Sequence, residues 1–409
     1  MRPRDVTILV VNDFAYVNGG SAQVALASAK ALAARGYNVI LFAAVGPAST
    51  DLGRSNLSAI CLDQHEIVED PNRIRAFVQG IWNFRASREM AALLSRLNPA
   101  VTIIHVHGWT KALSASVVRQ AAARGFRVVC TLHDYFSACP NGAFFHYPKG
   151  EACHLRPLSL GCIASACDKR NYAHKLWRVV RQVVQQRMGR LPGGIHQFIV
   201  PSKVCRGLLQ ESLPPGSGLH LVRNPIDMPK RDPVTVEANS SYVFAGRLAA
   251  EKGCLLLARA GHRAGCAVTF VGEGECRESI KKEFPSAMIT GWCDRPQLMH
   301  AMSRARVVVA PSLCYETQGL VVVEAAALGI PAIVPDTSAA KESVIHGVTG
   351  LWFKGGDVED LATKMQIMRE ADTVRRMGRA AYDRYWSSAE DLDSHVDKLE
   401  AIYEMTLAR

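Results

Sequence analysis

The sequence predicts an α/β protein with two Rossmann-like domains, each a doubly wound parallel sheet, that face each other across a cleft. Short apolar runs alternate with helix-length runs, which is typical of βαβ units and parallel sheets. The alternation occurs twice, on either side of a loop-like segment that begins at Asn224-Pro225. A chain of 409 residues is long enough for two domains of ordinary size.

The expected strands of the first half are continuously apolar, as in a sheet buried on both faces. They are VTILVV (6–11), NVILFAA (38–44), AVTIIHVH (100–107), RVVCTLHDY (127–135), HQFIVPS (196–202) and LHLVRNP (219–225). An Ala-rich helix closed by Gly36 follows the first strand, and the helix ASREMAALLSRLN leads through Pro99 to the third.

The second half repeats the pattern with five expected strands. They are SYVFAGRL (241–248), AVTFVGEGE (267–275), MITGWCD (288–294), RVVVAPS (306–312) and PAIVPD (331–336). We therefore expect an N-terminal domain over residues 1–228 and a C-terminal domain over 229–384. The amphipathic segment 385–409 is expected to form a helix that packs back on the first domain.

The composition bounds the class of protein. Hydrophobic residues make up 48% and charged residues 21% of the chain, as in globular proteins. No apolar run reaches about 18 residues, and the first apolar run predicts a strand rather than a secretory signal. The net charge of +11 suits nucleic acid, anionic lipid or a polyphosphate-bearing substrate. The basic residues are spread out, without an aromatic-interleaved patch, so we expect no nucleic-acid partner.

Ligands of open parallel sheets bind at the carboxyl ends of the strands, so the strand-end loops hold the candidate site residues. In FAGRLAAEKG, Arg247 and Lys252 precede a helix, where two cations and a helix N-terminus suit a diphosphate. The alternative is an exposed loop with ordinary surface charges. In NGGSAQVALASAK, Gly19-Gly20 let the first helical N–H groups approach an anion, although a plain tight turn is the simpler explanation.

The stretch SLCYETQGLVVVEAAALG carries two glutamates, Glu316 and Glu324, with seven residues between them. Glu316 is expected in a loop, and Gly319 and Leu320 begin a helix whose first amides form a positive end. Residues eight apart on an ideal helix differ by about 80° in direction, so Glu324 can face the same side and accept hydrogen bonds from ribose hydroxyls. The alternative partner is an Arg or Lys of the second domain in a buried ion pair.

His133 ends the strand RVVCTLHDY. An imidazole at that place can donate a hydrogen bond to a substrate hydroxyl or act on a proton. The alternative is a capping or core histidine.

Together these motifs resemble the retaining glycosyltransferase family 4, which has the GT-B fold. E-x7-E follows such a strand, and G-R-L-x-x-E-K-G lies some seventy residues before it. Further matching pieces are GGSAQVALASAKALAARGYNV, the HDY strand end, VRNPID, VGEGE and ESVIHGVTGLWF. The resemblance runs from about residue 7 to about residue 405, with the motifs in the family's order and at its separations.

The resemblance implies a role for each candidate residue. His133 and Glu316 would act as the catalytic residues that contact the donor sugar, and Glu324 would bind the ribose. Glu342 matches a further acidic position near the donor. The donor diphosphate would be bound by a set of cations and backbone amides: Gly20, Arg247, Lys252, Gly319 and Leu320.

The resemblance also implies a reaction. The family moves a sugar with retention of anomeric configuration and generally without a metal, so no cofactor is expected for the chemistry. We therefore expect a hexosyltransferase that uses a UDP- or GDP-sugar bound to the second domain. Its acceptor would be a glycan or a lipid-linked glycan on the first domain, in bacterial surface polysaccharide biosynthesis. A sugar-nucleotide 2-epimerase of the same fold and a non-catalytic basic binding protein are the alternatives.

Two departures from the family pattern stand near the donor. Gln318 occupies a place where the family usually has Phe, which affects local packing and sugar selectivity. The loop DTSAAKES lacks the paired glycines that are common there, so its diphosphate contacts are expected to differ.

Four of the twelve cysteines crowd into an insertion over residues 139–167. Four thiolates in such a span can bind zinc tetrahedrally, and the last two have the spacing of a ligand pair. A similar four-cysteine insertion resembles one in a polysaccharide-building branch of the family. A structural zinc, free thiols and a redox-active disulfide remain open for this set: Cys139, Cys153, Cys162 and Cys167.

A basic amphipathic helix is expected over residues 172–191. Its apolar residues at helical spacing are Trp177, Val180, Val184 and Met188. Its cations are Lys175, Arg178, Arg181, Arg187 and Arg190. This pattern fits a helix in a membrane interface beside anionic lipid, so we expect a cytoplasmic protein, peripheral at the inner face of the plasma membrane. The alternative is a helix that covers the first sheet with its charges in water.

Overall fold

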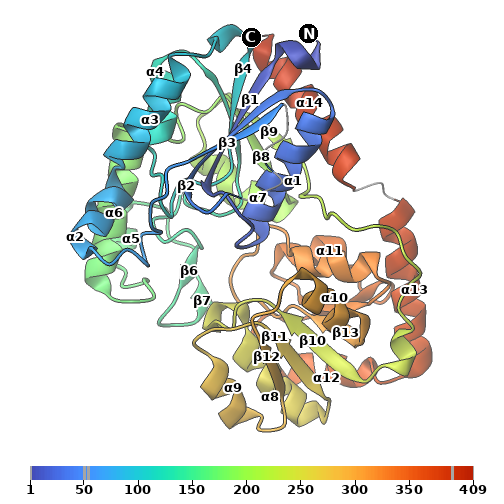
Figure 1. Cartoon of the computed structure of the whole chain (residues 1–409). Coiled ribbons are helices and arrows are strands. Elements are labelled where there is room, and N and C mark those ends of the chain that lie inside the picture. The colour runs from blue at the N-terminus through green and yellow to red at the C-terminus, as the bar shows by residue number, and fades with distance from the viewer. Residues whose placement is uncertain (1, 49–51, 53–55, 388–390, 409) are drawn as a thin grey trace. The chain divides into compact units, whose positions relative to one another are not determined.

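The computed structural model describes residues 2–48, 52, 56–387 and 391–408 (Figure 1). The chain divides into two compact units. Unit 1 comprises residues 1–143, 155–227 and 391–409, and unit 2 comprises residues 144–154 and 228–390.

Unit 1 is built on a seven-stranded sheet in the order β3-β2-β1-β4-β5-β8-β9, in which every neighbouring pair is parallel. The strands are β1 (Thr7–Phe14), β2 (Asn38–Val45), β3 (Leu57–Cys61), β4 (Thr102–Val106), β5 (Arg127–Thr131), β8 (Gln197–Val200) and β9 (Gly218–Leu221). The central strands are buried along their length because helices cover both faces.

The helices of unit 1 are α1 (Gly20–Ala34), α2 (Arg73–Ile81), α3 (Phe84–Leu94), α4 (Ser116–Ala123), α5 (Leu160–Ala164), α6 (Tyr172–Arg187), α7 (Lys203–Leu209) and α14 (Leu392–Leu407). In Figure 1, α1 and α14 lie on one side of the sheet and α3, α4 and α6 on the other.

The last helix packs back on unit 1, as the sequence predicts. Arg35, at the end of α1, pairs with Asp397 and Glu400 of α14 at 2.5 and 2.8 Å. In the interior of the unit, the Tyr403 hydroxyl lies 2.6 Å from Nδ1 of His105 on β4. Leu399 of α14 is fully buried in the core of the unit.

Unit 2 holds a six-stranded parallel sheet in the order β12-β11-β10-β13-β14-β15. The strands are β10 (Ser241–Ala245), β11 (Val268–Val271), β12 (Met288–Gly291), β13 (Ala305–Val309), β14 (Ala332–Pro335) and β15 (Gly350–Phe353). The helices are α8 (Cys254–Ala264), α9 (Arg277–Glu283), α10 (Arg295–Ser303), α11 (Leu320–Ala327), α12 (Val358–Ile367) and α13 (Ala371–Ser387). Both sheets are parallel and wound with helices, so the predicted fold class is confirmed.

A short antiparallel hairpin, β6 (Phe145–His146) and β7 (Glu151–Ala152), lies inside the cysteine-rich insertion. Its residues, 144–154, belong to unit 2, whereas the residues on either side belong to unit 1. The insertion is therefore divided between the units: Cys153 belongs to unit 2, and Cys139, Cys162 and Cys167 belong to unit 1.

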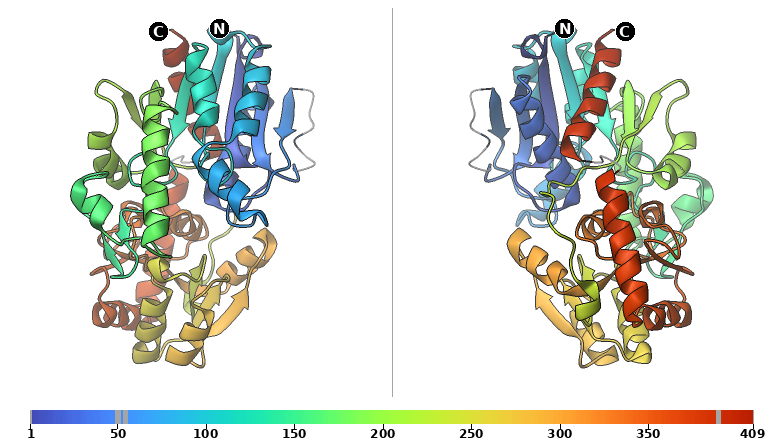
Figure 2. Two further views of the ribbon diagram at one scale, coloured as in Figure 1. Left: turned by 90° about the vertical axis from the view of Figure 1, so that its left-hand side faces the viewer. Right: turned by 90° about the vertical axis from the view of Figure 1, so that its right-hand side faces the viewer.

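Helix α6 buries its polar side and exposes apolar residues, unlike an ordinary surface helix. Lys175, Arg181 and Gln182 are buried, so the prediction that Lys175 and Arg181 lie beside lipid is wrong. Val180 and Val183 are 50% and 43% exposed. In the left view of Figure 2, α6 (green) runs along the front of its unit. Within the described residues, no helix is long and apolar enough to cross a membrane.

Candidate active site

The loops after β10 and β13 are held together at the carboxyl edge of the unit 2 sheet. The carbonyl of Glu251 accepts hydrogen bonds from the amides of Leu313 and Cys314 at 2.9 and 3.2 Å. Gly253 has a φ of +71°, and a Cβ there would lie 2.0 Å from the Pro311 carbonyl oxygen. Only glycine allows this approach, which explains why the loop ends in Glu-Lys-Gly.

Lys252 and Glu316, one on each loop, form the centre of the site. The Lys252 Nζ donates to Glu316 Oε1 at 2.7 Å, and the Ser312 hydroxyl donates to the same oxygen at 2.5 Å. Burial alone would raise the pKa of Glu316, but the charge and hydrogen bond of Lys252 and the Ser312 hydroxyl outweigh it and lower that pKa. Burial would lower the pKa of Lys252, and Glu316 raises it instead. Both groups are therefore charged at neutral pH.

Arg247 adds a second cation to this edge. It pairs with the buried carboxylate of Glu251, and its own side chain is 56% exposed. Its charge contributes to lowering the pKa of Glu316, so the three groups form one electrostatic cluster. With Glu251 counted, the cluster holds two cations, Arg247 and Lys252, and two carboxylates, Glu251 and Glu316.

Helix α11 begins beside the cluster. Gly319 is its N-cap with a φ of +86°, and a Cβ there would lie 3.0 Å from the Cβ of Ala340. Ala340 belongs to the short 3-10 helix Ala339–Ser343, which also carries Glu342. The structure therefore places the first amides of α11 and the Glu342 segment at the same end of the sheet.

Glu324 is buried in α11 with 5% exposure, and its partner is Arg295. Burial raises the pKa of Glu324, and the Arg295 charge and hydrogen bond oppose that shift. Arg295 is the first residue of α10, just after β12, so its own strand-end position was a signal in the sequence. The alternative of an ion pair within the second domain is the one that the structure contains.

Arg295 also has a nitrogen that can donate a hydrogen bond to a ligand. Its Nη2 is buried and has no hydrogen-bond partner in the part of the chain that the structure describes. A buried unpaired guanidinium nitrogen costs free energy, which a ligand oxygen would recover.

The remaining two donor-side candidates lie in unit 1. Gly20 is the first residue of α1. His133 follows β5, and its Nε2 lies 3.0 Å from Nδ1 of His107. Burial lowers the pKa of His133 to about 3, so its imidazole is neutral and can donate or accept a hydrogen bond at physiological pH.

Three of the four clustered cysteines gather around one side chain. The Lys175 Nζ lies 3.5 Å from Sγ of Cys162 and 3.3 Å from Sγ of Cys167. Cys139 donates to Asn141, whose side-chain nitrogen lies 3.5 Å from the Cys167 sulfur. Among the described residues, no group of three Cys, His, Asp or Glu is arranged to hold a metal ion. A zinc at Cys139, Cys153, Cys162 and Cys167 stays a prediction.

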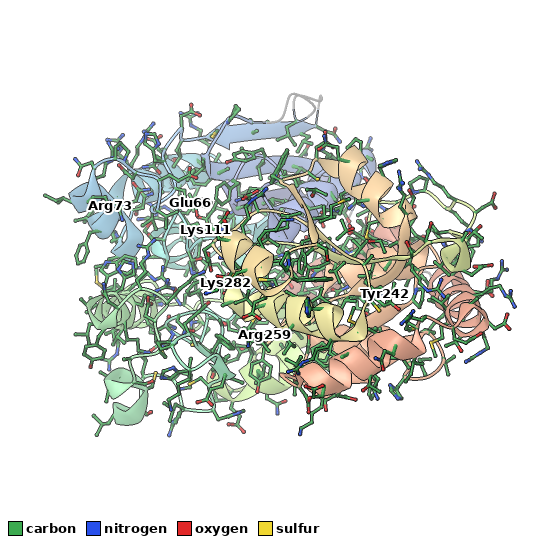
Figure 3. The ribbon with its side chains drawn as sticks, turned by 90° about the horizontal axis from the view of Figure 1, so that it is seen from below. Glu66, Arg73, Lys111, Tyr242, Arg259 and Lys282 are labelled. Carbon is green, nitrogen blue, oxygen red and sulfur yellow. The ribbon has the colours of Figure 1, made fainter. Side chains whose placement is uncertain are left out.

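Unit 1 contains a cavity of about 770 Å³ that the sequence does not predict. It lies at the start of α2 and α3, and amide, charged and aromatic side chains line it. They include Gln64, Arg75, Gln79, Trp82 and Phe84. Nearby, Glu66 and Lys111 lie next to each other in Figure 3 and form an ion pair of 3.8 Å, and Arg73 stands further out on α2.

The sequence matches known families over both units. Residues 18–229 match the family described as "Glycosyltransferase Family 4", and residues 239–370 match "Glycosyl transferases group 1". The chain belongs to glycosyltransferase family 4. Membership of this family makes the chain a glycosyltransferase.

Its relatives include the sulfoquinovosyl transferase SQD2 of Arabidopsis thaliana, 33% identical over 146 residues, which are 34% of this chain and 28% of that protein. The glycogen synthase of Mycobacterium tuberculosis is 27% identical over 311 residues, 68% of this chain and 71% of that protein. Among solved structures, HepE of Anabaena in complex with UDP and glucose superposes with a TM-score of 0.67 at 15% identity, covering 98% of this chain and 100% of that one. At that identity the likeness concerns the GT-B fold.

Proposed function

We propose that this glycosyltransferase moves a hexose-type sugar, with retention of configuration, from a nucleotide diphosphate donor to a glycan or lipid-linked acceptor. The observation that carries the proposal is the cluster of Lys252, Glu316 and Arg247 beside the N-terminus of α11. A diphosphate needs cations and N–H donors, and a sugar needs a carboxylate that accepts from its hydroxyls. This edge of the sheet supplies all three.

Arg247, Lys252 and the amides of Gly319 and Leu320 bind the diphosphate in this proposal. Glu316 is held by Ser312 and Lys252, and its second oxygen accepts hydrogen bonds from hydroxyls of the donor sugar. Binding then requires little rearrangement of these side chains, which reduces its entropic cost.

Glu324 and Arg295 bind the nucleoside part of the donor in this proposal. The Glu324 carboxylate accepts from the ribose hydroxyls, and the unpaired Nη2 of Arg295 donates to an oxygen of the nucleotide. Both groups are oriented by their mutual ion pair before the ligand arrives. The ion pair and the ribose contact are therefore compatible.

The chemistry is electrostatic. The bond between the anomeric carbon and the diphosphate oxygen breaks, and Lys252 and Arg247 stabilise the negative charge that develops on the leaving group. The acceptor hydroxyl attacks on the face that the diphosphate leaves, and its proton passes to the departing phosphate oxygen. No divalent cation is needed in this scheme because the two side chains neutralise the leaving group.

The test is calorimetric titration with UDP, GDP and ADP, followed by analysis of the product anomer by NMR with the matching donor. We expect one nucleotide to bind at micromolar concentration, and Lys252→Ala and Glu324→Gln to weaken it at least tenfold. Arg259→Ala, an exposed helix residue paired with Glu283, is the matched control and keeps wild-type affinity. Failure of all three nucleotides to bind the folded protein would overturn the proposal, and a sugar altered without transfer would favour the epimerase.

The exposed apolar side of α6 supports the proposal that the enzyme meets its acceptor at an anionic membrane. Leu176, Val180 and Val183 are exposed on this helix, and Ile74 and Phe77 of the neighbouring α2 are 79% and 54% exposed. Trp177 links the two helices, with its ring 5.9 Å from that of Phe77. Exposed cations lie on these two helices or next to them in the sequence: Arg73, Lys169, Arg170, Arg187 and Arg190. Exposed apolar residues on helices that also carry exposed cations suit the headgroup region of anionic lipid.

The 770 Å³ cavity opens beside this patch, because Ile74 and Phe84 line the cavity and are exposed. We therefore place the acceptor's sugar headgroup in this cavity and its lipid in the adjacent membrane. A lipid-linked intermediate of surface polysaccharide synthesis, at the inner face of a bacterial plasma membrane, has this chemistry.

Co-sedimentation with vesicles tests the membrane contact. We expect binding to vesicles that contain phosphatidylglycerol, weaker binding to pure phosphatidylcholine, and several-fold loss for Val180→Asp. Met288→Asp changes an exposed apolar residue of unit 2 and is the control. Equal loss in both variants, or none in either, would argue against this surface.

A further inference from the structure

Lys175 is a fully buried lysine whose ammonium is surrounded by sulfur. The side chain has 0% exposure, and its Nζ lies 3.3 Å from Cys167 Sγ and 3.5 Å from Cys162 Sγ. Within the described residues, no oxygen accepts a hydrogen bond from this nitrogen. Asn141 fixes the Cys167 sulfur from a second direction at 3.5 Å.

Burial alone disfavours an ammonium ion at this place, and the neighbouring sulfurs of Cys167 and Cys162 oppose that effect and raise the pKa of Lys175. Burying a charge costs several kcal/mol unless strong acceptors replace water, and a thiol is a weak acceptor. A lysine selected only for packing would be replaced by an apolar side chain at lower cost. The contact between the amine and two thiols is therefore the feature that requires a chemical explanation.

We propose that Lys175 and Cys167 form a covalent N–O–S bridge when the protein meets hydrogen peroxide. The amine nitrogen and the sulfur already lie in contact at 3.3 Å, with both side chains held by the surrounding core. One inserted oxygen atom spans this separation with less movement than a direct N–S bond would require. Cys167 is nearer to the amine than Cys162 and is the one anchored by Asn141, so it is the reacting thiol.

The reaction balances with two molecules of peroxide. The first oxidises the Cys167 thiol to a sulfenic acid and leaves as water. The second accepts the other two electrons as the Lys175 amine joins the sulfenic oxygen, so one N–O bond forms and the amine loses one hydrogen. In sum, R–SH + R′–NH2 + 2 H2O2 gives R–S–O–NH–R′ + 3 H2O, and a thiol reductant reverses it.

The bridge would tie the loop after α5 to α6. Both elements belong to unit 1, and α6 carries the exposed apolar surface described above. A cross-link between segments that are near in the chain restricts the unfolded state and raises the unfolding temperature. Oxidation is thus expected to stabilise this part of unit 1 without altering the donor cluster in unit 2.

The test is mass spectrometry of the full-length protein, purified with reductant and then exposed to graded hydrogen peroxide. We expect a gain of one oxygen with a loss of two hydrogens, reversed by dithiothreitol. Peptide mapping is expected to join Lys175 to Cys167, with no tryptic cleavage after Lys175. Zinc content is measured on the same sample.

Variants keep the proposal falsifiable. Lys175→Arg retains the cation, and Cys167→Ser removes the sulfur; both lose the mass change and the peroxide-dependent rise in melting temperature. Cys61→Ser, a half-buried cysteine elsewhere in unit 1, retains both. A disulfide in place of the bridge, stoichiometric zinc that protects the thiols, or no reaction of the wild-type protein would each overturn the proposal.

Discussion

At the scale of single residues, each of three buried or partly buried carboxylates of the candidate site has a cation as its partner. Glu316 accepts from Lys252, Glu324 pairs with Arg295, and Glu251 pairs with Arg247. The first two pairs join segments that follow different strands of the same sheet, whereas Arg247 and Glu251 both belong to the loop after β10. The candidate site is therefore preorganised by ion pairs whose members, apart from Glu251, are also the groups proposed to meet the donor.

Lys252→Ala tests this dual use of one residue. We expect kcat/KM to fall about 10²–10³-fold, because one charge that stabilises the leaving diphosphate is lost. The pKa of Glu316 should rise, since Lys252 is the main group that lowers it. The acidic limb of the pH–rate profile should therefore move to higher pH.

The pH dependence of initial rates at saturating acceptor measures both effects, with Arg259→Ala as the control. A fall in rate with an unchanged acidic limb would show that Lys252 does not control the ionisation of Glu316.

Buried histidines predict a pH-dependent stability for unit 1. Burial lowers the pKa of His105 and His133 to about 3 and that of His395 to about 4. The unfolded chain binds protons at these sites below about pH 6.5, while the folded protein does not. Each histidine therefore removes up to about 1.4 kcal/mol of unfolding free energy per pH unit as the pH falls from that value toward the folded pKa.

Urea unfolding followed between pH 7 and 5 checks this slope. His395→Gln keeps a side chain that hydrogen-bonds but does not titrate, so the slope should fall by up to one proton. His262→Gln, an exposed histidine of unit 2, should leave it unchanged. An identical slope in wild type and His395→Gln would contradict the assignment.

At the scale of elements, two glycines flank α8 in the same left-handed conformation. Comparing them distinguishes the cost of backbone strain from the cost of a close contact with another loop. Gly253 has a φ of +71° and meets the Pro311 carbonyl, whereas Gly265 has a φ of +61° and open space around it. Gly265→Ala should cost about 1 kcal/mol, the strain alone. Gly253→Ala should cost more and should also reduce donor binding, because the loop that carries Lys252 must move away from the loop that carries Glu316.

Denaturant unfolding and nucleotide titration of both variants measure the two effects separately. Equal losses of stability with unchanged nucleotide affinity in both would mean that the contact with Pro311 does not position the site.

The strands and their end loops were predictable from the sequence because their signal is local. Continuous apolar runs marked β1, β10 and β13, and the charged residues after them fell where parallel strands end. β3 and β15 were not predicted, although other strands of the same length were. Both lie at an edge of their sheet, and β3 is half-exposed.

What the sequence did not predict depends on tertiary partners. In α6 the periodicity shows an apolar stripe but not which side of the helix is covered. Gln182 bonds the carbonyl of Ser137, Gln185 bonds Trp109, and Lys175 meets two sulfurs, so the polar side faces inward. Arg295 likewise could be identified as the partner of Glu324 only once the position of β12 in the sheet was known.

At the scale of the whole molecule, the chain builds two cores and returns to the first one at its end. Leu399 of α14 is fully buried in the core of unit 1, although it follows all of unit 2 in the sequence. Met365 of α12 is fully buried in the core of unit 2. Separate cores predict that the two units respond separately to core truncation.

Leu399→Ala and Met365→Ala each remove a buried side chain and should cost about 2–5 kcal/mol in the unit that holds it. In differential scanning calorimetry, we expect Leu399→Ala to lower the melting temperature of unit 1 by several degrees. We expect Met365→Ala to lower that of unit 2. The nucleotide that the wild type binds should raise the unit 2 transition in both variants, since ligand binding stabilises the unit that holds the site. If either substitution moves both transitions equally, the cores unfold as one cooperative system and α14 couples them.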